Sequence, residues 1–310
     1  MIPAVHLQYS AAGLLIGLLV GMTGMGGGSL MTPMLVLVFG FKPTVAIGTD
    51  IVHGAIFKSF GAVRHRQLGT VNLSLTLWML VGSAPMSLAG VGVATWLEHT
   101  YGDSWENAAK KVLGVTLLLC GLAFLVKALL HLRKSTEGFR LSSSDRARAV
   151  TIGLIGGFVV GLTSVGSGTF FGLTMMLFFP LSMAQIVGTD IVHAAALLWV
   201  AGFGHIVAGN VDFHAMGWLL IGSIPGVLIG SHFTVRAGDR FLRVALATTL
   251  SLSGVKLVDF PGANIVVLAG SALALGGALV VVARVLRRRL LVPGISPERL
   301  PDQAGEAAGS

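Results

Sequence analysis

The sequence predicts an all-α integral membrane protein, a polytopic helical bundle of two inverted repeats with re-entrant or broken helices and about 7–9 membrane segments. Composition and an internal duplication indicate this. Hydrophobic residues make up 54% of the chain and charged residues 11%, with a mean hydropathy of +0.85, whereas soluble proteins carry about a quarter charged residues. Residues 21–90 align with 161–230 at an offset of 140 without a gap, with 23 identities in 70 positions.

Each repeat is centred on the hexapeptide GTDIVH, at 48–53 and again at 188–193. Each copy follows a glycine-rich break, at 24–29 in the first repeat and at 164–169 in the second. Six consecutive identities that include an Asp and a His exceed what hydrophobic bias alone would produce. The most polar part of each repeat therefore lies inside otherwise apolar sequence.

The first repeat is expected to begin with two half-helices, 10–22 and 30–39, that meet at the break inside the membrane. A glycine cluster is a poor helix interior because each Gly costs about 1 kcal/mol relative to Ala. Further helices are expected over 44–62, 72–96 and 109–131, with loops at 64–66 and 97–108. The second repeat follows the same order, with helices expected over 149–163, 170–179, 184–206, 213–235 and 240–258.

The chain is divided accordingly into a first membrane repeat, a basic cytoplasmic linker, a second membrane repeat, an extra C-terminal transmembrane helix and a disordered tail. Their bounds are 1–132, 133–148, 149–260, 261–290 and 291–310. The tail contains Pro, Gly and acidic residues, a composition typical of disorder.

The charge of the loops indicates their orientation, since cytoplasmic loops carry an excess of Lys and Arg. If each broken segment is re-entrant, the basic segments 64–66, 133–148 and 236–243 and the Arg-rich C-terminal region are all cytoplasmic, and the acidic 97–108 lies outside. If the broken segments span the membrane, 236–243 and the C-terminal region fall outside, against the rule. The re-entrant assignment gives each repeat three crossings in opposite orientation, which is a transporter architecture.

Other classes of protein fit the sequence poorly. The net charge of +8 would suit nucleic acid, but the basic residues flank apolar segments, so no nucleic-acid partner is expected. The single Cys120 excludes an internal disulfide framework, and the first ten residues lack the basic region of a cleaved signal peptide. His193 and His205 have no Cys or second carboxylate at ligand spacing, so no metal is expected. Since no catalytic triad, nucleophile elbow or phosphate loop occurs, we expect neither an enzyme nor a cofactor.

The two glycine breaks are the predicted substrate site. Non-helical backbone at membrane depth is tolerated where it lines a cavity, and two helix N-termini that meet near the midplane would form an anion cage. Ser29 and Thr169 are placed to cap these helices. Alternatively, the glycines serve only close helix packing. The candidate substrate-binding residues are Gly26, Gly27, Gly28, Ser29, Thr49 and His53 in the first repeat, and Gly166, Ser167, Gly168, Thr169, Thr189 and His193 in the second.

Asp50 and Asp190 are the only acids placed well inside apolar segments, where a charge costs about 3 kcal/mol on insertion scales. Each has a His three residues later on the same helical face. Either each Asp caps its own helix, or Asp and His organise the site or relay protons. Lys58, which aligns with Leu198, either binds an anion in the cavity or snorkels to the interface.

Two stretches carry a resemblance to a known family. GMGGGSLMTPMLVLVFGFKPTVAIGTDIVHGAIFK, followed by HRQLGTVN, resembles the first repeat of the TauE/SafE family, often called sulfite exporters, and GTDIVHAAALLWVAGFGHIVAGNVDF resembles its second repeat. The resemblance covers roughly residues 10–260. It implies that the family's glycine-rich motif falls on Gly26–Ser29 and its GTD motif on Gly48–Asp50. The second copy departs from the first at Ser167, which replaces the middle glycine.

The resemblance implies a multi-pass carrier in the bacterial inner membrane that exports sulfite or an organosulfonate. We expect alternating access, with one repeat rocking against the other. A passive anion channel and a non-transporting assembly or scaffold protein are the alternatives. The expected partners are a small anion, the lipid bilayer and, as a candidate coupling ion, protons. A homodimer is left open, as are the exact substrate and the direction of transport.

Overall fold

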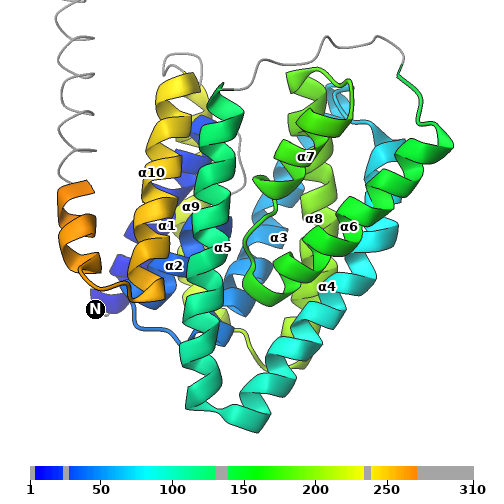
Figure 1. Ribbon diagram of the computed structural model, residues 1–310. Coiled ribbons are helices and arrows are strands. Elements are labelled where there is room, and N and C mark those ends of the chain that lie inside the picture. Colours follow the sequence, from blue (N-terminus) through cyan, green and yellow to red (C-terminus); the bar gives the residue numbers. More distant parts are fainter. Residues whose placement is uncertain (1–3, 24–27, 130–138, 234–238, 271–310) are drawn as a thin grey trace, which may run out of the picture. The chain divides into compact units, whose positions relative to one another are not determined.

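The computed structural model describes residues 4–23, 28–129, 139–233 and 239–270, and all regular structure in these ranges is helical, which confirms the predicted all-α fold (Figure 1). The helices of the first repeat are α1 (Ala4–Thr23), α2 (Gly28–Leu37), α3 (Pro43–Gln67), α4 (Leu73–Tyr101) and α5 (Asp103–Leu129). Those of the second are α6 (Ser143–Thr163), α7 (Phe170–Phe178), α8 (Met183–Val207), α9 (Phe213–Phe233) and α10 (Asp239–Val258). Residues 263–270 are also helical. The remainder of the predicted C-terminal helix and the tail 291–310 lie outside the described residues.

The 140-residue offset relates α1 to α6, α2 to α7, α3 to α8, α4 to α9 and α5 to α10. Close contacts show the relative direction of the central pair, α3 and α8. Gly48, near the start of α3, lies against Asn210, which follows the end of α8, and Gly188, near the start of α8, lies against Thr70, which follows the end of α3. The two helices are therefore antiparallel, as inverted repeats require.

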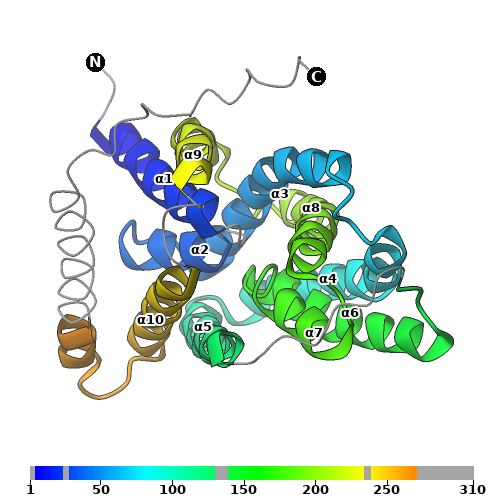
Figure 2. The same ribbon diagram turned by 90° about the horizontal axis from the view of Figure 1, so that it is seen from above.

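The two repeats are interleaved. Helix α1 of the first repeat packs along α9 of the second, α6 of the second packs along α4 of the first, and the equivalent pairs α3–α8 and α5–α10 pack on each other (Figure 2). One hydrophobic core gathers α1, α2, α5, α9 and α10, and another gathers α3, α4, α6, α7 and α8. Rocking of one intact repeat against the other would break both the α1–α9 and the α4–α6 contact.

Glycines allow the interleaved helices to approach at backbone distance. A Cβ added to Gly13 of α1 would lie 2.2 Å from the carbonyl oxygen of Leu219 in α9, and one added to Gly153 of α6 would lie 2.2 Å from that of Met79 in α4. Such contacts are typical of small-residue packing between membrane helices, where van der Waals contact drives association.

The second broken segment is re-entrant. Helix α6 runs away from the end of the bundle at which α3 and α5 finish, and α7 turns back towards it (Figure 1). Phe170 and Phe171, at the start of α7, lie beside Gly156, two turns before the end of α6, so the chain reverses direction in the break. The corresponding turn of the first repeat, 24–27, lies outside the described residues.

The helices extend further than the sequence predicts at three boundaries. The predicted loop 97–108 is wrong: Gly102 (φ 50°) alone separates α4 from α5, because a residue at positive φ turns the chain and Asp103 and Glu106 suit the first turn of a helix. Residues 64–66 form the last turn of α3 instead of a loop. Helix α6 begins at Ser143 inside the predicted linker, where Ser142 and Asp145 form a capping box.

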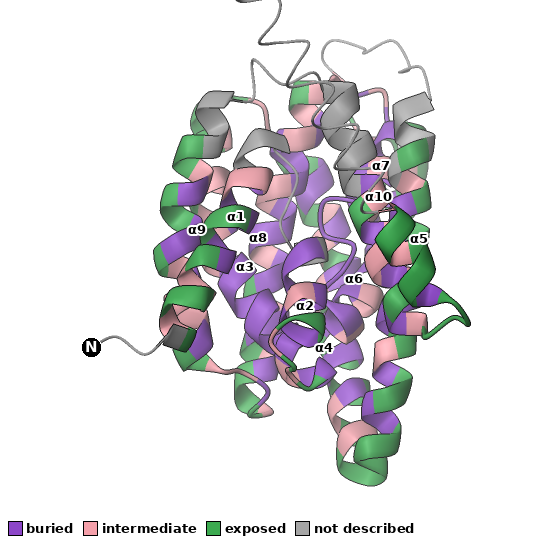
Figure 3. Ribbon diagram, turned by 90° about the vertical axis from the view of Figure 1, so that its left-hand side faces the viewer, coloured by how far each residue is buried: buried purple, intermediate pink, exposed green. Residues whose placement is uncertain are grey.

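Among the described helices, α4, α6 and α8 are long and apolar enough to cross a membrane by length and composition. The central helices α3 and α8 carry buried residues along most of their length (Figure 3). The hexapeptides lie on these two helices, so the most polar sequence of each repeat is placed in the interior of the bundle.

Candidate functional site

The two hexapeptide histidines make equivalent contacts across the repeats. Nε2 of His53 lies 2.8 Å from the hydroxyl of Ser223 on α9, and Nε2 of His193 lies 2.9 Å from the hydroxyl of Ser83 on α4. The serines belong to the duplicated Gly-Ser-x-Pro at 82–85 and 222–225. Each histidine therefore ties the central helix of its own repeat to the other repeat.

The hexapeptide threonines also form equivalent hydrogen bonds in the two repeats. The hydroxyl of Thr49 accepts a hydrogen bond from the backbone N–H of Asp212 (3.0 Å), and that of Thr189 accepts one from the backbone N–H of Asn72 (2.9 Å). Asp212 and Asn72 immediately precede α9 and α4, so each threonine satisfies an amide at a helix start. Both threonines are fully buried, and their contacts in this conformation are with protein.

Asp50 is the centre of a buried polar cluster. Its Oδ2 accepts hydrogen bonds from the hydroxyls of Thr32 on α2 (2.5 Å) and Ser164 at the end of α6 (2.9 Å). Asp50 lies seven residues after Pro43, the first residue of α3, so the alternative in which it caps its own helix is wrong. Asp190 on α8 lies equally far from the start of its helix and is also buried.

Lys58 is buried in the same region. Its side chain is 4% exposed, and its Nζ donates a hydrogen bond to the hydroxyl of Ser167 at 2.8 Å. Asp190 and Asp50 both attract the ammonium electrostatically. The snorkelling alternative is therefore wrong, because the ammonium points into the protein and contacts the second glycine break.

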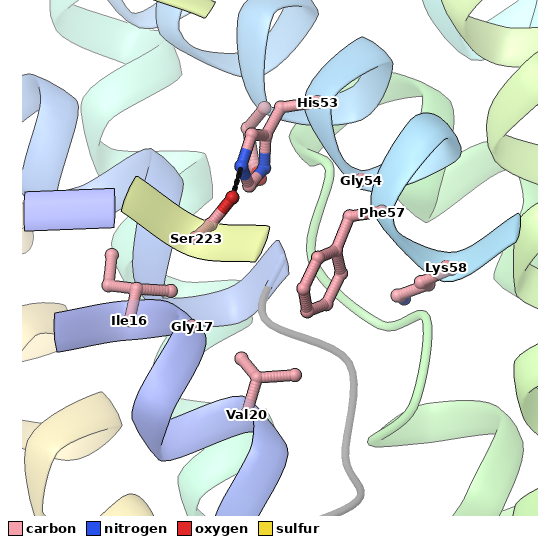
Figure 4. A pocket seen from close by; sticks show the side chains of 9 residues that line it. Ile16, Gly17, Val20, His53, Gly54, Phe57, Lys58 and Ser223 are labelled. Atoms are coloured by element: carbon pink, nitrogen blue, oxygen red, sulfur yellow. Dashed lines mark hydrogen bonds between the residues drawn. The ribbon is translucent and has the colours of Figure 1, made fainter. Parts of the chain in front are cut away.

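Asp50 and Lys58 line the same small pocket (Figure 4). Asp50, His53 and Lys58 line it from α3, Ser223 lines it from α9, and apolar residues of α1 with Phe57 of α3 close it. The free volume of the pocket is about 10 Å³, which is space for about one water molecule. The site is occluded in this conformation and must widen to accept a larger ligand.

The second glycine break has a backbone that only glycine adopts easily. Gly166 (φ 120°) and Gly168 (φ 102°) lie at positive φ. Thr169 is the N-cap residue of α7, but its hydroxyl donates to Sγ of Cys120 (3.2 Å) and does not cap the helix. Among the described residues, nothing accepts a hydrogen bond from the backbone N–H groups of Gly168 and Thr169. This helix start therefore offers buried donors beside Lys58.

The structure brings some of the predicted site residues together and separates others. Asp50, Lys58 and His53 line the pocket, and Ser167 contacts Lys58. His193 lies instead against Ser83 and Phe171. Gly26 and Gly27 lie outside the described residues. Gly28 and Ser29 open α2, so Ser29 lies inside its helix and not at the predicted cap position.

The sequence analysis did not predict three residues that contact Asp50 or His53: Thr32, Ser164 and Ser223. The duplicated Gly-Ser-x-Pro was a signal for Ser223. No local pattern marks Thr32 and Ser164, whose partner Asp50 is 18 and 114 residues away. No group of three or more His, Cys, Asp or Glu residues able to hold a metal occurs in the part of the chain that the structure describes.

An interleaved bundle of inverted repeats with an occluded charged site in its interior defines a class of protein, the membrane transporters. Comparison with known proteins gives the particular family. The model of the family described as sulfite exporter TauE/SafE matches residues 9–257, and the chain belongs to this family.

Relatives of known sequence agree with this assignment. The probable membrane transporter protein YjnA of Bacillus subtilis (strain 168) is 40% identical over 248 residues, which cover 79% of this chain and 97% of that protein. The probable membrane transporter protein YdhB of the same organism is 27% identical over 246 residues, covering 79% and 96%. A probable membrane transporter protein of Haemophilus influenzae is 24% identical over 250 residues, covering 75% and 87%. No solved structure matches the chain.

Proposed function

We propose that this membrane transporter is a secondary carrier that exports a small sulfur-containing anion, sulfite or an organosulfonate, across the bacterial inner membrane by alternating access. The observation that carries the proposal is the buried ammonium of Lys58, which is bonded to Ser167 in the glycine break that precedes α7. A buried cation close to amide groups that have no acceptor among the described residues favours an anionic ligand.

The occluded pocket is the state expected of a carrier between its two open states. Space for about one water molecule cannot conduct an anion continuously, so passage requires a conformational change. The family description supports sulfite as the cargo. The carboxylate-bearing cluster beside Lys58 supports coupling to a second ion.

The distribution of charge supports a multi-pass topology with the basic end in the cytoplasm. The ends of α3 and α5 and the start of α6 gather at one end of the bundle, where Arg64, Arg66, Arg146 and Arg148 lie (Figure 1). The junction of α4 and α5, with Glu98, Asp103 and Glu106, lies at the opposite end. Cytoplasmic flanks are enriched in Lys and Arg.

Flux measurements in liposomes test the proposal. Wild-type protein should move sulfite or methanesulfonate, and an imposed proton gradient should drive accumulation. Gly168→Leu should reduce flux by about tenfold or more. A side chain at this positive φ strains the backbone at the start of α7, and a strain of ~1.4 kcal/mol corresponds to a tenfold change. Gly217→Leu is the matched control, since Gly217 has open space around it. Flux that no gradient drives uphill would indicate a channel, and absence of anion flux a scaffold.

A further inference from the structure

The polar contacts in the interior fall into a symmetric and an asymmetric set. The symmetric set contains the His–Ser and Thr–amide bonds, each of which occurs twice with partners related by the offset of 140. Equivalent residues make equivalent bonds there because both repeats need the same helix connections. The symmetric set is therefore the scaffold of the inverted repeat.

The asymmetric set is the cluster around Asp50 and Lys58. Its members have no polar equivalent in the other repeat: Lys58 aligns with Leu198, Thr32 with Gly172, Ser164 with Gly24 and Ser167 with Gly27. Only Asp50 has a matching residue, Asp190. A scaffold role would not require these polar groups on one side alone, so the asymmetry indicates a function that the chain performs once.

We propose that the duplicated motif carries a single oxyanion site, formed by Lys58, Ser167 and the N–H groups of Gly168 and Thr169, and that the anion enters it together with one proton taken up by Asp50. This proposal rests on anion transport as the proposed function. It goes further by giving the number of sites, the binding residues and the coupled ion, and export together with a proton then runs on the outward gradient of the anion itself.

Lys58 supplies the charge that binds the anion. Among the residues whose burial is described, it is the one buried Lys or Arg. Its present acceptor is the neutral hydroxyl of Ser167, which itself can donate to an incoming oxyanion. An anion that displaces this contact gains a charge-assisted hydrogen bond, together with the amide donors of Gly168 and Thr169, which have no acceptor in the part of the chain that the structure describes.

The charge balance of the cluster requires a proton. Two carboxylates attract Lys58 electrostatically, Asp50 in the same pocket and Asp190, so the ionised cluster carries one net negative charge and a bound monovalent anion would raise it to two. An uncompensated buried charge costs several kcal/mol, and uptake of one proton by a carboxylate keeps the net charge of the cluster unchanged. Asp50 is the acceptor because it lines the pocket, and the hydroxyls of Thr32 and Ser164 can reverse to accept from its neutral form.

The other groups around the cluster are accounted for. Asp190 and His193 of α8 interact electrostatically with Lys58. On α3 itself, His53 is bonded to Ser223 of α9. From α1, the lining residues are Ile16, Gly17 and Val20, which carry no charge.

Calorimetric titration of the full chain in detergent tests the inference, with sodium methanesulfonate and sodium sulfite as probes. Methanesulfonate keeps one negative charge across the working pH range, so proton uptake measured in buffers of different ionisation enthalpy comes from the protein. We expect one anion per chain and uptake of about one proton per anion at about pH 8. Lys58→Leu, which introduces the residue of the second repeat, should weaken binding by about tenfold or more. Lys58→Gln is the second variant, and heat unfolding checks the fold of both.

Two variants separate the parts of the inference. Asp50→Asn should bind the anion without proton uptake, and Lys256→Leu, which removes an exposed Lys, should behave as wild type. Two anions per chain, unchanged binding in both Lys58 variants, or wild-type binding without proton uptake would overturn the inference while leaving anion transport in place. Absence of both binding and flux in the wild type would instead remove the proposed function itself.

Discussion

Gly222 of α9 is predicted to be essential for the packing of the two repeats. A Cβ at this position would lie 1.8 Å from the carbonyl oxygen of Ser10 and 2.7 Å from the backbone nitrogen of Leu14, both in α1. Real Cβ atoms essentially never come closer than 3.0 Å, so Gly222→Ala must separate the helices by at least 1.2 Å (3.0 − 1.8). Neither backbone atom can rotate away. Overpacking of this kind costs about 1–3 kcal/mol.

The assay is heat unfolding of purified protein in detergent, with Gly217→Ala as the control. Gly217 lies in the same helix with nothing within 4 Å of its added Cβ, so its replacement should stabilise the helix by about 0.5–1 kcal/mol. At about 2–4 °C per kcal/mol for a large domain, Gly222→Ala should lower the unfolding midpoint by several degrees and Gly217→Ala should raise it slightly. Equal midpoints for the two variants would refute the close α1–α9 packing.

Three further predictions follow from the polar contacts and the burial of the one cysteine. Thr189→Val keeps the shape but removes the acceptor of the Asn72 amide, so the midpoint should fall by the equivalent of about 1–3 kcal/mol; an unchanged midpoint would show that water replaces the hydroxyl. Ser223→Ala removes the partner of His53 and should lower the midpoint by the equivalent of about 1 kcal/mol; an unchanged midpoint would show that this hydrogen bond does not stabilise the contact between α3 and α9. Cys120, which is 6% exposed, should resist a maleimide reagent in the folded protein and react after denaturation; rapid labelling of folded protein would contradict its burial.

The sequence is informative about the helices because the signals for them are local. Long apolar runs, the glycine-rich breaks and the repeated hexapeptide predicted every helix of the two repeats, and the charge of the helix ends predicted the re-entrant second break. The errors concern boundaries. Polar segments such as 97–108 were interpreted as loops, although they continue a helix beyond its apolar part.

The interpretation of the hexapeptide changed most. The repeated hexapeptide suggested substrate contacts for its Thr and His and a site-organising or proton-relay role for its Asp, yet Thr49 and Thr189 bond to backbone at the helix starts of the opposite repeat. Residue type alone could not separate these roles, because a buried hydroxyl serves a helix start and a ligand by the same hydrogen bond.

The sequence by itself determined that the chain is a duplicated helical membrane protein and where its helices break. Only the tertiary structure decided which residues meet. The helices are apolar on most sides, so no amphipathic stripe predicts their neighbours, and the interleaving of the repeats brings Lys58 to Ser167 over 109 residues and Asp50 to Ser164 over 114. The asymmetric charged cluster exists because long-range packing gathers residues that differ between the two copies.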